Sequence, residues 1–283
     1  MLSRAQQHPQ LIAHGAIVTE VASDYIFTEG PAADTSGNVY FTDQPNDRIH
    51  KWSAEDNSVS IFLEPSGRSN GLYLDQQGNI IACADENFEI WSIDQNKKKK
   101  VIIADVKGKK LNGPNDLWID PHGGIYFTDP YYQRPYWERK QKEIEQERVY
   151  YLTPDKSRIL TVIDDFVRPN GIIGTPDGKT LYVADIGDKK TYSYSINADA
   201  SLSDKTLFAP LGSDGMTIDQ QGNVYLTGDG VSVFNKKGNL IQHIPIEQKW
   251  TANVTFGGLD RRTLFITAMT SVYTLKMNVK GAQ

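Results

Sequence analysis

The sequence predicts an all-β protein, a six-bladed β-propeller with four-stranded blades, and two observations lead to this prediction. A hairpin-like segment recurs six times along the 283 residues, and one strand-like run near the start of the chain has no hairpin partner of its own. Self-similarity with a period of about forty residues, with several short strands in each repeat, is typical of propeller blades.

The recurring segment joins a turn, usually containing glycine, to a run of β-branched and aromatic residues. This combination is the signature of a tight hairpin, because glycine adopts the positive φ that such turns need. The copies begin at positions 34, 75, 120, 175, 219 and 260, so the successive spacings are 41, 45, 55, 44 and 41 residues. Six repeats of this length fill the chain, which we expect to form a single propeller domain over residues 1–283.

Each repeat divides into short strands. We expect four in the second repeat, at 71–74, 79–84, 88–93 and 101–105, and four in the fifth, at 215–218, 223–227, 231–235 and 240–244. The sixth repeat has residues for only three, at 254–257, 263–268 and 271–277. The run 16–27 is therefore predicted to supply the outer strand of the last blade and to close the ring, which hides an otherwise open edge.

The longest spacing comes from an insertion at 130–148 in the third repeat. Its second half, 138–148, is highly charged and predicts one or two solvated helical turns. Its first half is aromatic and offers a different interpretation, a lid over a pocket, because long insertions in a blade lie at the faces where function is found. On that interpretation Tyr131 and Trp137 are candidate substrate contacts.

A polar residue stands five positions before each repeat start, where the first strand of each blade begins. First strands line the channel of a propeller, so these side chains should meet in one small volume. None of them is Lys, Arg or His, and two carboxylates with amide oxygens predict a site for a hard divalent cation. Asn-Gly pairs are also typical of turns, so for Asn70 a role as a turn residue stays open as an alternative. The six residues are Glu29, Asn70, Asn115, Asn170, Asp214 and Thr255.

Several segments resemble the signature sequences of the gluconolactonase / senescence-marker-protein (regucalcin) family. They are Glu29-Gly-Pro, Asn112-Gly-Pro-Asn115-Asp116-Leu, Asn170-Gly, Ser213-Asp214-Gly-Met216 and Phe256-Gly-Gly258. The resemblance runs from about residue 28 to the C-terminus and implies a six-bladed propeller of lactone hydrolases with one divalent metal in the channel. It also implies that Glu29, Asn170 and Asp214 are the main metal ligands, and that Asn115 is a fourth ligand or a substrate contact.

One position departs from the animal branch of that family. The animal proteins carry a sugar-binding arginine two residues before the position of Asn115, where this chain has Gly113. The Pro-Asn-Asp sequence instead resembles the bacterial gluconolactonase-like branch. We therefore do not expect the sugar-acid lactone specificity of the animal type.

These features predict a metal-dependent hydrolase that opens a sugar-lactone ring, with calcium as the foremost metal and magnesium, manganese or zinc as alternatives. The metal would act as a Lewis acid, and a carboxylate would act as general base. The family resemblance points to Asp214 as this base, whereas the residues alone also allow Glu29. Asn70 is a further candidate substrate contact. The alternatives are a non-enzymatic metal- or ligand-binding propeller and a related ester or organophosphate hydrolase.

Composition narrows the possible partners. The chain carries 30 Lys and Arg against 35 Asp and Glu, a formal net charge of −5, and has no basic block, so a nucleic-acid partner is not expected. It lacks an apolar run long enough to span a membrane and shows no signal-peptide pattern, which predicts a soluble cytoplasmic or periplasmic protein. The expected partner is a small-molecule lactone, and the oligomeric state is left open.

Overall fold

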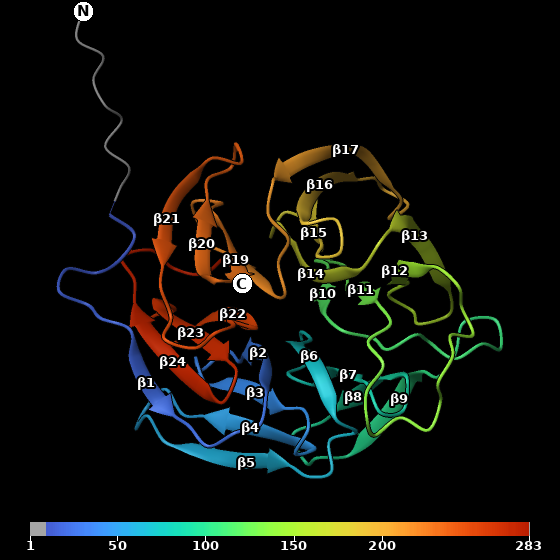
Figure 1. The fold of residues 1–283 in the computed structure, drawn as a ribbon, viewed down its shortest axis with the longest axis horizontal. Coiled ribbons are helices and arrows are strands. Elements are labelled where there is room, and N and C mark those ends of the chain that lie inside the picture. Colours follow the sequence, from blue (N-terminus) through green and yellow to red (C-terminus); the bar gives the residue numbers. More distant parts are fainter. Residues whose placement is uncertain (1–9, 283) are drawn as a thin grey trace, which may run out of the picture.

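The computed structural model describes residues 10–282 and confirms the predicted architecture, with six four-stranded antiparallel sheets arranged as the blades of a ring (Figure 1). No helix occurs among the described residues. The strands of each blade are given from the axis outward. Blade 1 contains β2 (Thr28–Ala33), β3 (Val39–Asp43), β4 (Arg48–Trp52) and β5 (Val59–Leu63). Blade 2 contains β6 (Ser69–Leu74), β7 (Ile80–Ala84), β8 (Glu89–Ile93) and β9 (Lys99–Ile103), and blade 3 contains β10 (Leu117–Ile119), β11 (Ile125–Asp129), β12 (Glu147–Leu152) and β13 (Ile159–Phe166).

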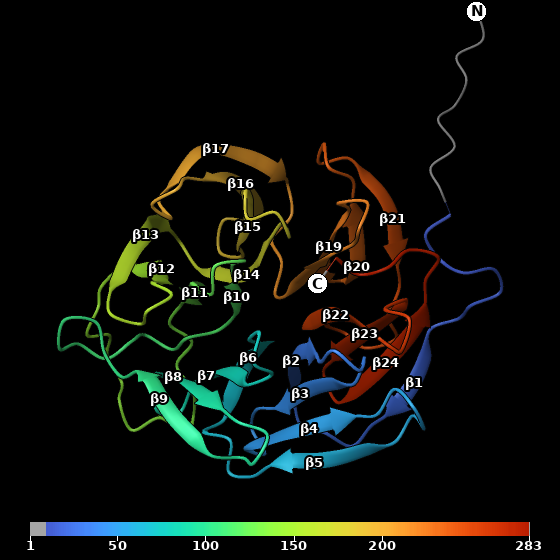
Figure 2. The same ribbon diagram turned by 180° about the vertical axis from the view of Figure 1, so that it is seen from behind.

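The second half of the chain repeats this order, and the view from behind shows the same ring from its other face (Figure 2). Blade 4 contains β14 (Pro169–Gly174), β15 (Thr180–Asp185), β16 (Lys190–Ile196) and β17 (Leu202–Ala209); blade 5 contains β18 (Met216–Ile218), β19 (Val224–Gly228), β20 (Gly230–Phe234) and β21 (Leu240–Ile244); and blade 6 contains β22 (Asn253–Gly257), β23 (Thr263–Ala268), β24 (Ser271–Lys276) and β1 (Thr19–Ala22).

Strand β1 closes the ring, as the unfinished sixth repeat predicted. It pairs with β24 in antiparallel register, with Thr19 opposite Thr274 and Glu20 opposite Tyr273. The strand is shorter than the predicted run 16–27, because residues 16–18 and 23–27 are irregular; within the strand, the pairing has a bulge between Glu20 and Ala22. The two ends of the chain therefore share one sheet, and β24 has no open edge over this length.

The core lies between the blades, because neighbouring sheets pack face to face. The second strands β3, β7, β11 and β19 are buried along their whole length, with the largest buried side chains including Tyr40, Phe41, Phe127 and Tyr225. Apolar residues on both faces of these strands explain why the recurring segments contain unbroken β-branched and aromatic runs rather than a strict alternation.

The insertion between β11 and β12 does not form the helical turns predicted for its charged half; residues 130–146 contain only turns, bends and irregular backbone. Its charged side chains bind neighbouring groups instead of pairing along a helix. Arg139 Nη2 donates to Asn112 O (2.6 Å) and its guanidinium lies 3.7 Å from the Phe88 ring centroid, while Lys142 Nζ donates to Glu147 Oε1 (2.7 Å). Tertiary contacts therefore override the local preference of this segment.

The described part of the chain has no helix of the length and apolarity needed to cross a bilayer.

Candidate metal and substrate site

The predicted ring residues lie where the innermost strands begin, and a break in strand register re-aims several of them. In β2 the pairing with the second strand shifts just after Glu29, and in β6 and β14 the shift spans Asn70 and Asn170 themselves. Such bulges bend a strand and redirect a side chain, and they are frequent beside active sites. Asn115 and Asp214 instead stand two residues before β10 and β18.

The glycine after each of four ring residues is required by the close approach of the next blade. A Cβ added to Gly30, Gly71 or Gly171 would lie 2.1 Å from Asn70 O, 2.5 Å from Asn115 O and 2.7 Å from Asp214 O respectively. A Cβ on Gly215 would lie 1.9 Å from Asn253 Cγ. The Asn70-Gly71 pair is therefore part of an inter-blade contact within β6, and the turn alternative for Asn70 is wrong.

The sixth ring position is occupied by Asn253, and the prediction of Thr255 is wrong. In five blades the four-residue hairpin turn starts at the counted repeat position, as when Gly37 N donates to Asp34 O, but in blade 6 the turn starts at Gly258, two residues before Asp260. Counting from Asp260 therefore displaced the register by two residues. Asn253 pairs with Thr267 as Glu29 pairs with Thr42, whereas Thr255 lines a cavity farther along the channel.

Three carboxylic acids, Glu29, Asp116 and Asp214, gather at this level of the channel, and the amide of Asn253 links the first two. Its Nδ2 donates to Glu29 Oε2 (3.3 Å) and to Asp116 Oδ2 (3.4 Å). Glu29 Oε2 also accepts from Gly30 N (2.8 Å), and Asp116 Oδ1 accepts from Leu117 N (2.9 Å). Asp116 was missed at the sequence level because it follows the ring residue Asn115 and was assigned no role of its own.

Burial raises the pKa of each of these acids. The pKa of Glu29 is raised well above its ordinary value, first by burial and then by the charges of Asp214 and Asp116. Burial raises the pKa of Asp116 to about 8 and that of Asp214 to about 6, the latter opposed by hydrogen bonds from Trp250 and Asn170 and by the charge of Arg134. The metal-free site thus disfavours ionised carboxylates, and a bound cation would remove this penalty.

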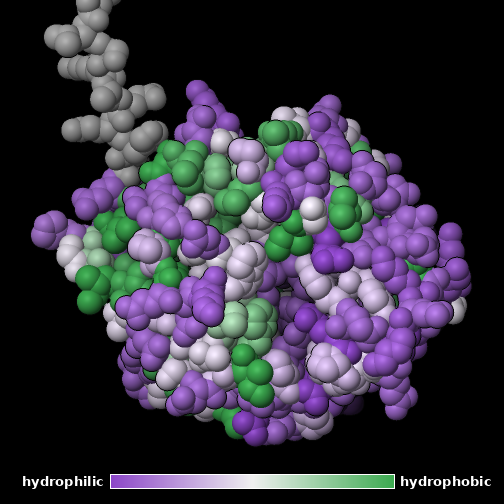
Figure 3. Space-filling view, viewed as in Figure 1, coloured by the Kyte–Doolittle hydropathy of each residue, from purple (hydrophilic) through white to green (hydrophobic). Residues whose placement is uncertain are grey.

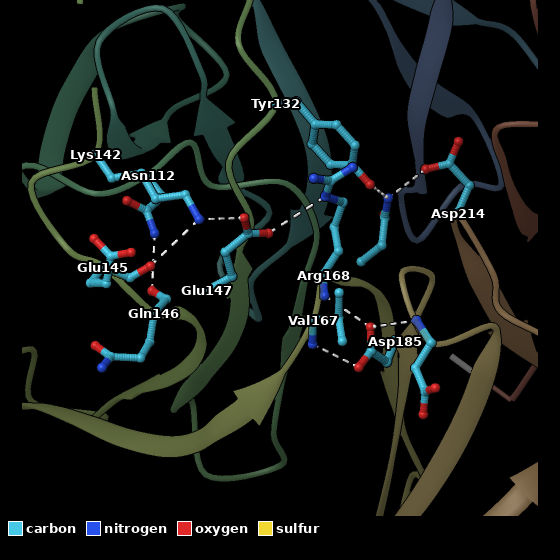
Figure 4. A network of polar contacts seen from close by, with 12 residues as sticks. Asn112, Tyr132, Lys142, Glu145, Gln146, Glu147, Val167, Arg168, Asp185 and Asp214 are labelled. Atoms are coloured by element: carbon cyan, nitrogen blue, oxygen red, sulfur yellow. Dashed lines mark hydrogen bonds and ion pairs between the residues drawn. The ribbon is translucent and has the colours of Figure 1, made fainter. Parts of the chain in front are cut away.

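Asp214 is held by two donors that orient its carboxylate, and one of these two hydrogen bonds is drawn in Figure 4. Asn170 Nδ2 donates to Asp214 Oδ1 (2.8 Å), and Trp250 Nε1 donates to Asp214 Oδ2 (2.6 Å). Asn170 Nδ2 also donates to the hydroxyl of Tyr132 (3.0 Å), so the insertion reaches the site through this side chain. Tyr132 and Trp250 come from loops, and no periodic signal in the sequence could have placed them here.

The oxygen atoms of this site suit a hard divalent cation. Asn70 Oδ1 and Asn170 Oδ1 are buried without a hydrogen-bond partner among the described residues, and an unpaired buried amide oxygen is unfavourable unless a ligand satisfies it. Together with the carboxylates of Glu29 and Asp214 they form an all-oxygen donor set. No group of three or more His, Cys, Asp or Glu side chains within residues 10–282 is arranged to hold a metal, so a cation at this site would also need the amide oxygens as ligands.

The remaining candidates lie around the ring. Asn115 is buried, and its backbone bridges two neighbours, with N donating to Thr128 O (2.9 Å) and O accepting from Gly71 N (2.7 Å). Trp137 is only 2% exposed and packs against Phe88 with ring centroids 4.8 Å apart. Tyr131 packs against Trp137 (5.6 Å). Both aromatic residues belong to the packing of the insertion, and their contact with substrate stays a prediction.

The face in Figure 3 is largely hydrophilic and is hollowed near its centre. Inside the propeller, Asp116 and Asn253 also line a small cavity whose other walls include the apolar side chains of Leu72, Ile172 and Met216. The polar ring is therefore bordered on that side by an apolar part of the channel.

Fold and site together define a class: six-bladed propellers whose channel carries a cluster of carboxylates and amide oxygens at the start of the inner strands. Residues 27–270 match the family model described as the SMP-30/Gluconolactonase/LRE-like region. The chain belongs to this family, which confirms the resemblance seen in the sequence.

The similarity to known proteins extends over nearly the full length of the chain. The chain is 30% identical to a gluconolactonase of Zymomonas mobilis over 92% of this chain and 81% of the relative. A crystal structure described as a gluconolactonase of Xanthomonas campestris superposes with a TM-score of 0.87 at 29% identity, covering 96% of each chain. A second crystal structure, of a protein assigned to the gluconolactonases, superposes with a TM-score of 0.90 at 31% sequence identity. It covers 97% of this chain and 96% of the other. These similarities support the expectation of a lactonase-type hydrolase.

Proposed function

We propose that this protein is a metal-dependent hydrolase that opens the ring of a sugar lactone. The observation that carries the proposal is the pair formed by the buried Glu29 and the partly buried Asp214, beside the unpaired amide oxygens of Asn70 and Asn170. Glu29, Asn170 and Asp214 would hold the cation, and Asn115 is a fourth ligand or a substrate contact. Calcium is the foremost candidate, because the donors are all oxygen and come from flexible side chains.

A divalent cation bound there would polarise the lactone carbonyl and lower the pKa of a water molecule. The residues of the chain supply the rest. Asp214 accepts the proton of the attacking water, and its two hydrogen-bond donors hold the carboxylate in one orientation. Since a general base must be ionised, these donors also assist it by lowering the pKa that burial raises.

Asp214 is preferred over Glu29 as the base because of its access to solvent. Glu29 is 2% exposed, whereas Asp214 is only partly buried and lies beside the loop residue Trp250. A base that takes a proton from an incoming water must face the volume that water enters. We assign Glu29 the role of an anchoring ligand.

A lactone assay tests this function. Purified protein is stripped of metal with EDTA and then assayed with δ-gluconolactone and a panel of simpler lactones, with acid release followed by a pH indicator with and without added calcium, magnesium, manganese or zinc. We expect hydrolysis that depends on one of these metals. Asp214→Asn, in a protein that still folds, should lower kcat/KM by at least a thousandfold.

If no lactone gives metal-dependent acid release although the metal binds, the protein is a non-enzymatic metal-binding propeller. Full activity of Asp214→Asn would instead refute the assignment of the base alone.

A further inference from the structure

The arginines at the mouth of the site are not used by the proposed hydrolysis. Arg134 comes from the insertion, and Arg168 lies between β13 and β14, two residues before Asn170. Their guanidinium groups lie 5.4 Å and 5.0 Å from the same ring centroid, that of Tyr132. The two positive charges are therefore within about 10 Å of each other at most. Tyr132 places them next to the site, because its hydroxyl accepts a hydrogen bond from Asn170.

Neither arginine is fully neutralised by an acid of the protein. Arg134 Nε lies 3.6 Å from Asp85 Oδ2, but that oxygen already accepts the hydroxyl of Tyr136 at 2.6 Å. Arg168 Nε lies 3.6 Å from Glu147 Oε2, while Glu147 Oε1 accepts Lys142 Nζ at 2.7 Å (Figure 4). The Nε atoms of both arginines are buried and have no hydrogen-bond partner among the described residues. Each arginine is thus the second and more distant partner of its acid.

The carboxylates of the site are the obvious alternative partners of these charges. Arg134 is near enough for its charge to lower the pKa of Asp214. However, a divalent cation held by Glu29 and Asp214 would neutralise those carboxylates, leaving the two guanidinium groups around Tyr132 as uncompensated positive charges beside the site. Two like charges on one aromatic ring repel each other, and a bound anion removes this repulsion. Arginine is also well suited to phosphate and carboxylate, because its planar fork can donate two hydrogen bonds to one group.

We propose that Arg134 and Arg168 bind an anionic substituent of the substrate, so that the preferred substrate is a sugar lactone carrying a phosphate, sulfonate or carboxylate group away from the ring carbonyl. This inference rests on the proposed function for the identity of the sugar lactone. Tyr132 acts as the support that holds both guanidinium groups at the site. Arg134 and Arg168 are specificity-determining residues and take no part in proton transfer.

A binding measurement tests the inference independently of turnover. Isothermal titration calorimetry in 1 mM calcium chloride compares gluconate, which lacks a distal anion, with 6-phosphogluconate and with glucarate, which carries a distal carboxylate. We expect the wild-type protein to bind at least one of the two distal anions at least tenfold more tightly than gluconate. The ligand with the larger ratio identifies phosphate or carboxylate as the group recognised.

The variants Arg134→Gln and Arg168→Gln should each reduce this ratio at least fivefold and change gluconate affinity less than twofold. Arg48→Gln is the matched control, because it removes the same charge from an exposed Arg48–Glu64 ion pair (3.1 Å) on β4, and it should leave the ratio unchanged. Thermal unfolding verifies that each variant is folded.

Equal wild-type affinity for all three ligands would overturn the inference, as would a parallel loss of gluconate and 6-phosphogluconate affinity in the arginine variants. The two proposals fail separately. Failure of every lactone to be hydrolysed, with the binding preference intact, refutes the hydrolase and leaves anion recognition by Arg134 and Arg168 standing.

Discussion

Replacing Glu29 by Gln should stabilise the metal-free protein while abolishing its response to metal. The substitution keeps the local hydrogen bonds, because a Gln oxygen placed at the position of Glu29 Oε2 still accepts from Gly30 N and from Asn253 Nδ2. What it removes is a buried charge close to two other acids. Since metal binding needs that charge, one substitution should move the stabilities of the metal-free and metal-bound protein in opposite directions.

The size of the expected change in stability is worked from the pKa of the neighbouring acid, Asp214. The pKa of Asp214 rises from 3.8 to about 6, which is about 2 units and corresponds to about 3 kcal/mol at 1.36 kcal/mol per unit. Glu29 is the more deeply buried of the two acids and its pKa is raised in the same direction, so Glu29→Gln is expected to raise the Tm of the metal-free protein. An unfolding entropy of about 2.1 cal/mol/K per residue gives about 0.6 kcal/mol per °C for 283 residues, so a contribution of the size worked for Asp214 corresponds to about 5 °C.

The pH dependence has a definite sign. Because the pKa of Glu29 is higher in the folded than in the unfolded protein, the folded protein is relatively stable below the ordinary pKa of 4.5 and loses stability as the pH rises through the folded value. The advantage of Glu29→Gln should therefore be largest at alkaline pH and vanish near pH 4.

Differential scanning calorimetry in EDTA and in 1 mM calcium, between pH 4 and pH 9, measures both effects. A metal-free Tm of Glu29→Gln at or below that of the wild type at pH 8 would show that Glu29 is not an uncompensated buried charge. An unchanged calcium-induced rise in Tm would remove Glu29 from the metal site. The conservative variant Glu29→Asp, which keeps the charge, should not gain stability in EDTA.

Three further predictions concern the frame of the site. Gly71→Ala places a Cβ 2.5 Å from Asn115 O and should lower the Tm by roughly 5 °C. The control Gly78→Ala, whose Cβ meets nothing within 4 Å, should lower the free energy of unfolding by only about 1 kcal/mol. If calorimetry finds that the two variants lose the same stability, the inter-blade contact at Gly71 is contradicted. Deleting residues 1–27 removes β1 and exposes β24, so the Tm should fall by several °C and aggregation should increase; an intact thermal midpoint would refute closure by β1. Trp250→Phe removes a donor to Asp214 and should raise the pKa of that carboxyl, so the acid limb of the pH–rate profile should move to higher pH, and an unmoved limb would argue against Asp214 as the base.

The hairpin repeat could be predicted from the sequence because it depends on local chemistry. A turn with glycine followed by β-branched residues specifies the same hairpin wherever it occurs, and blade number and ring closure follow from counting. The ring residues could be predicted for the same reason where the turn is regular. In blade 6 the turn begins at Gly258 rather than at an aspartate, and counting from Asp260 gave Thr255 in place of Asn253.

What could not be predicted depends on contacts between distant segments. Tyr132 and Trp250 reach Asn170 and Asp214 from loops whose paths are set by packing on other blades. The charged half of the insertion has a composition suited to a helix, but its side chains find partners such as Phe88 and Glu147 on the propeller itself. A single sequence carries no signal for such partners.

The seam between the first and last blades has a consequence for how the protein is made in the cell. Glu29 lies in the first blade to be synthesised, and Asn253, whose amide links it to Asp116, lies in the last. A chain emerging from the ribosome can stack five blades and still lack both the final sheet and the amide that holds Glu29. The site is therefore completed only when the last blade has been synthesised, because a chain that stops before residue 253 lacks the amide that links Glu29 to Asp116.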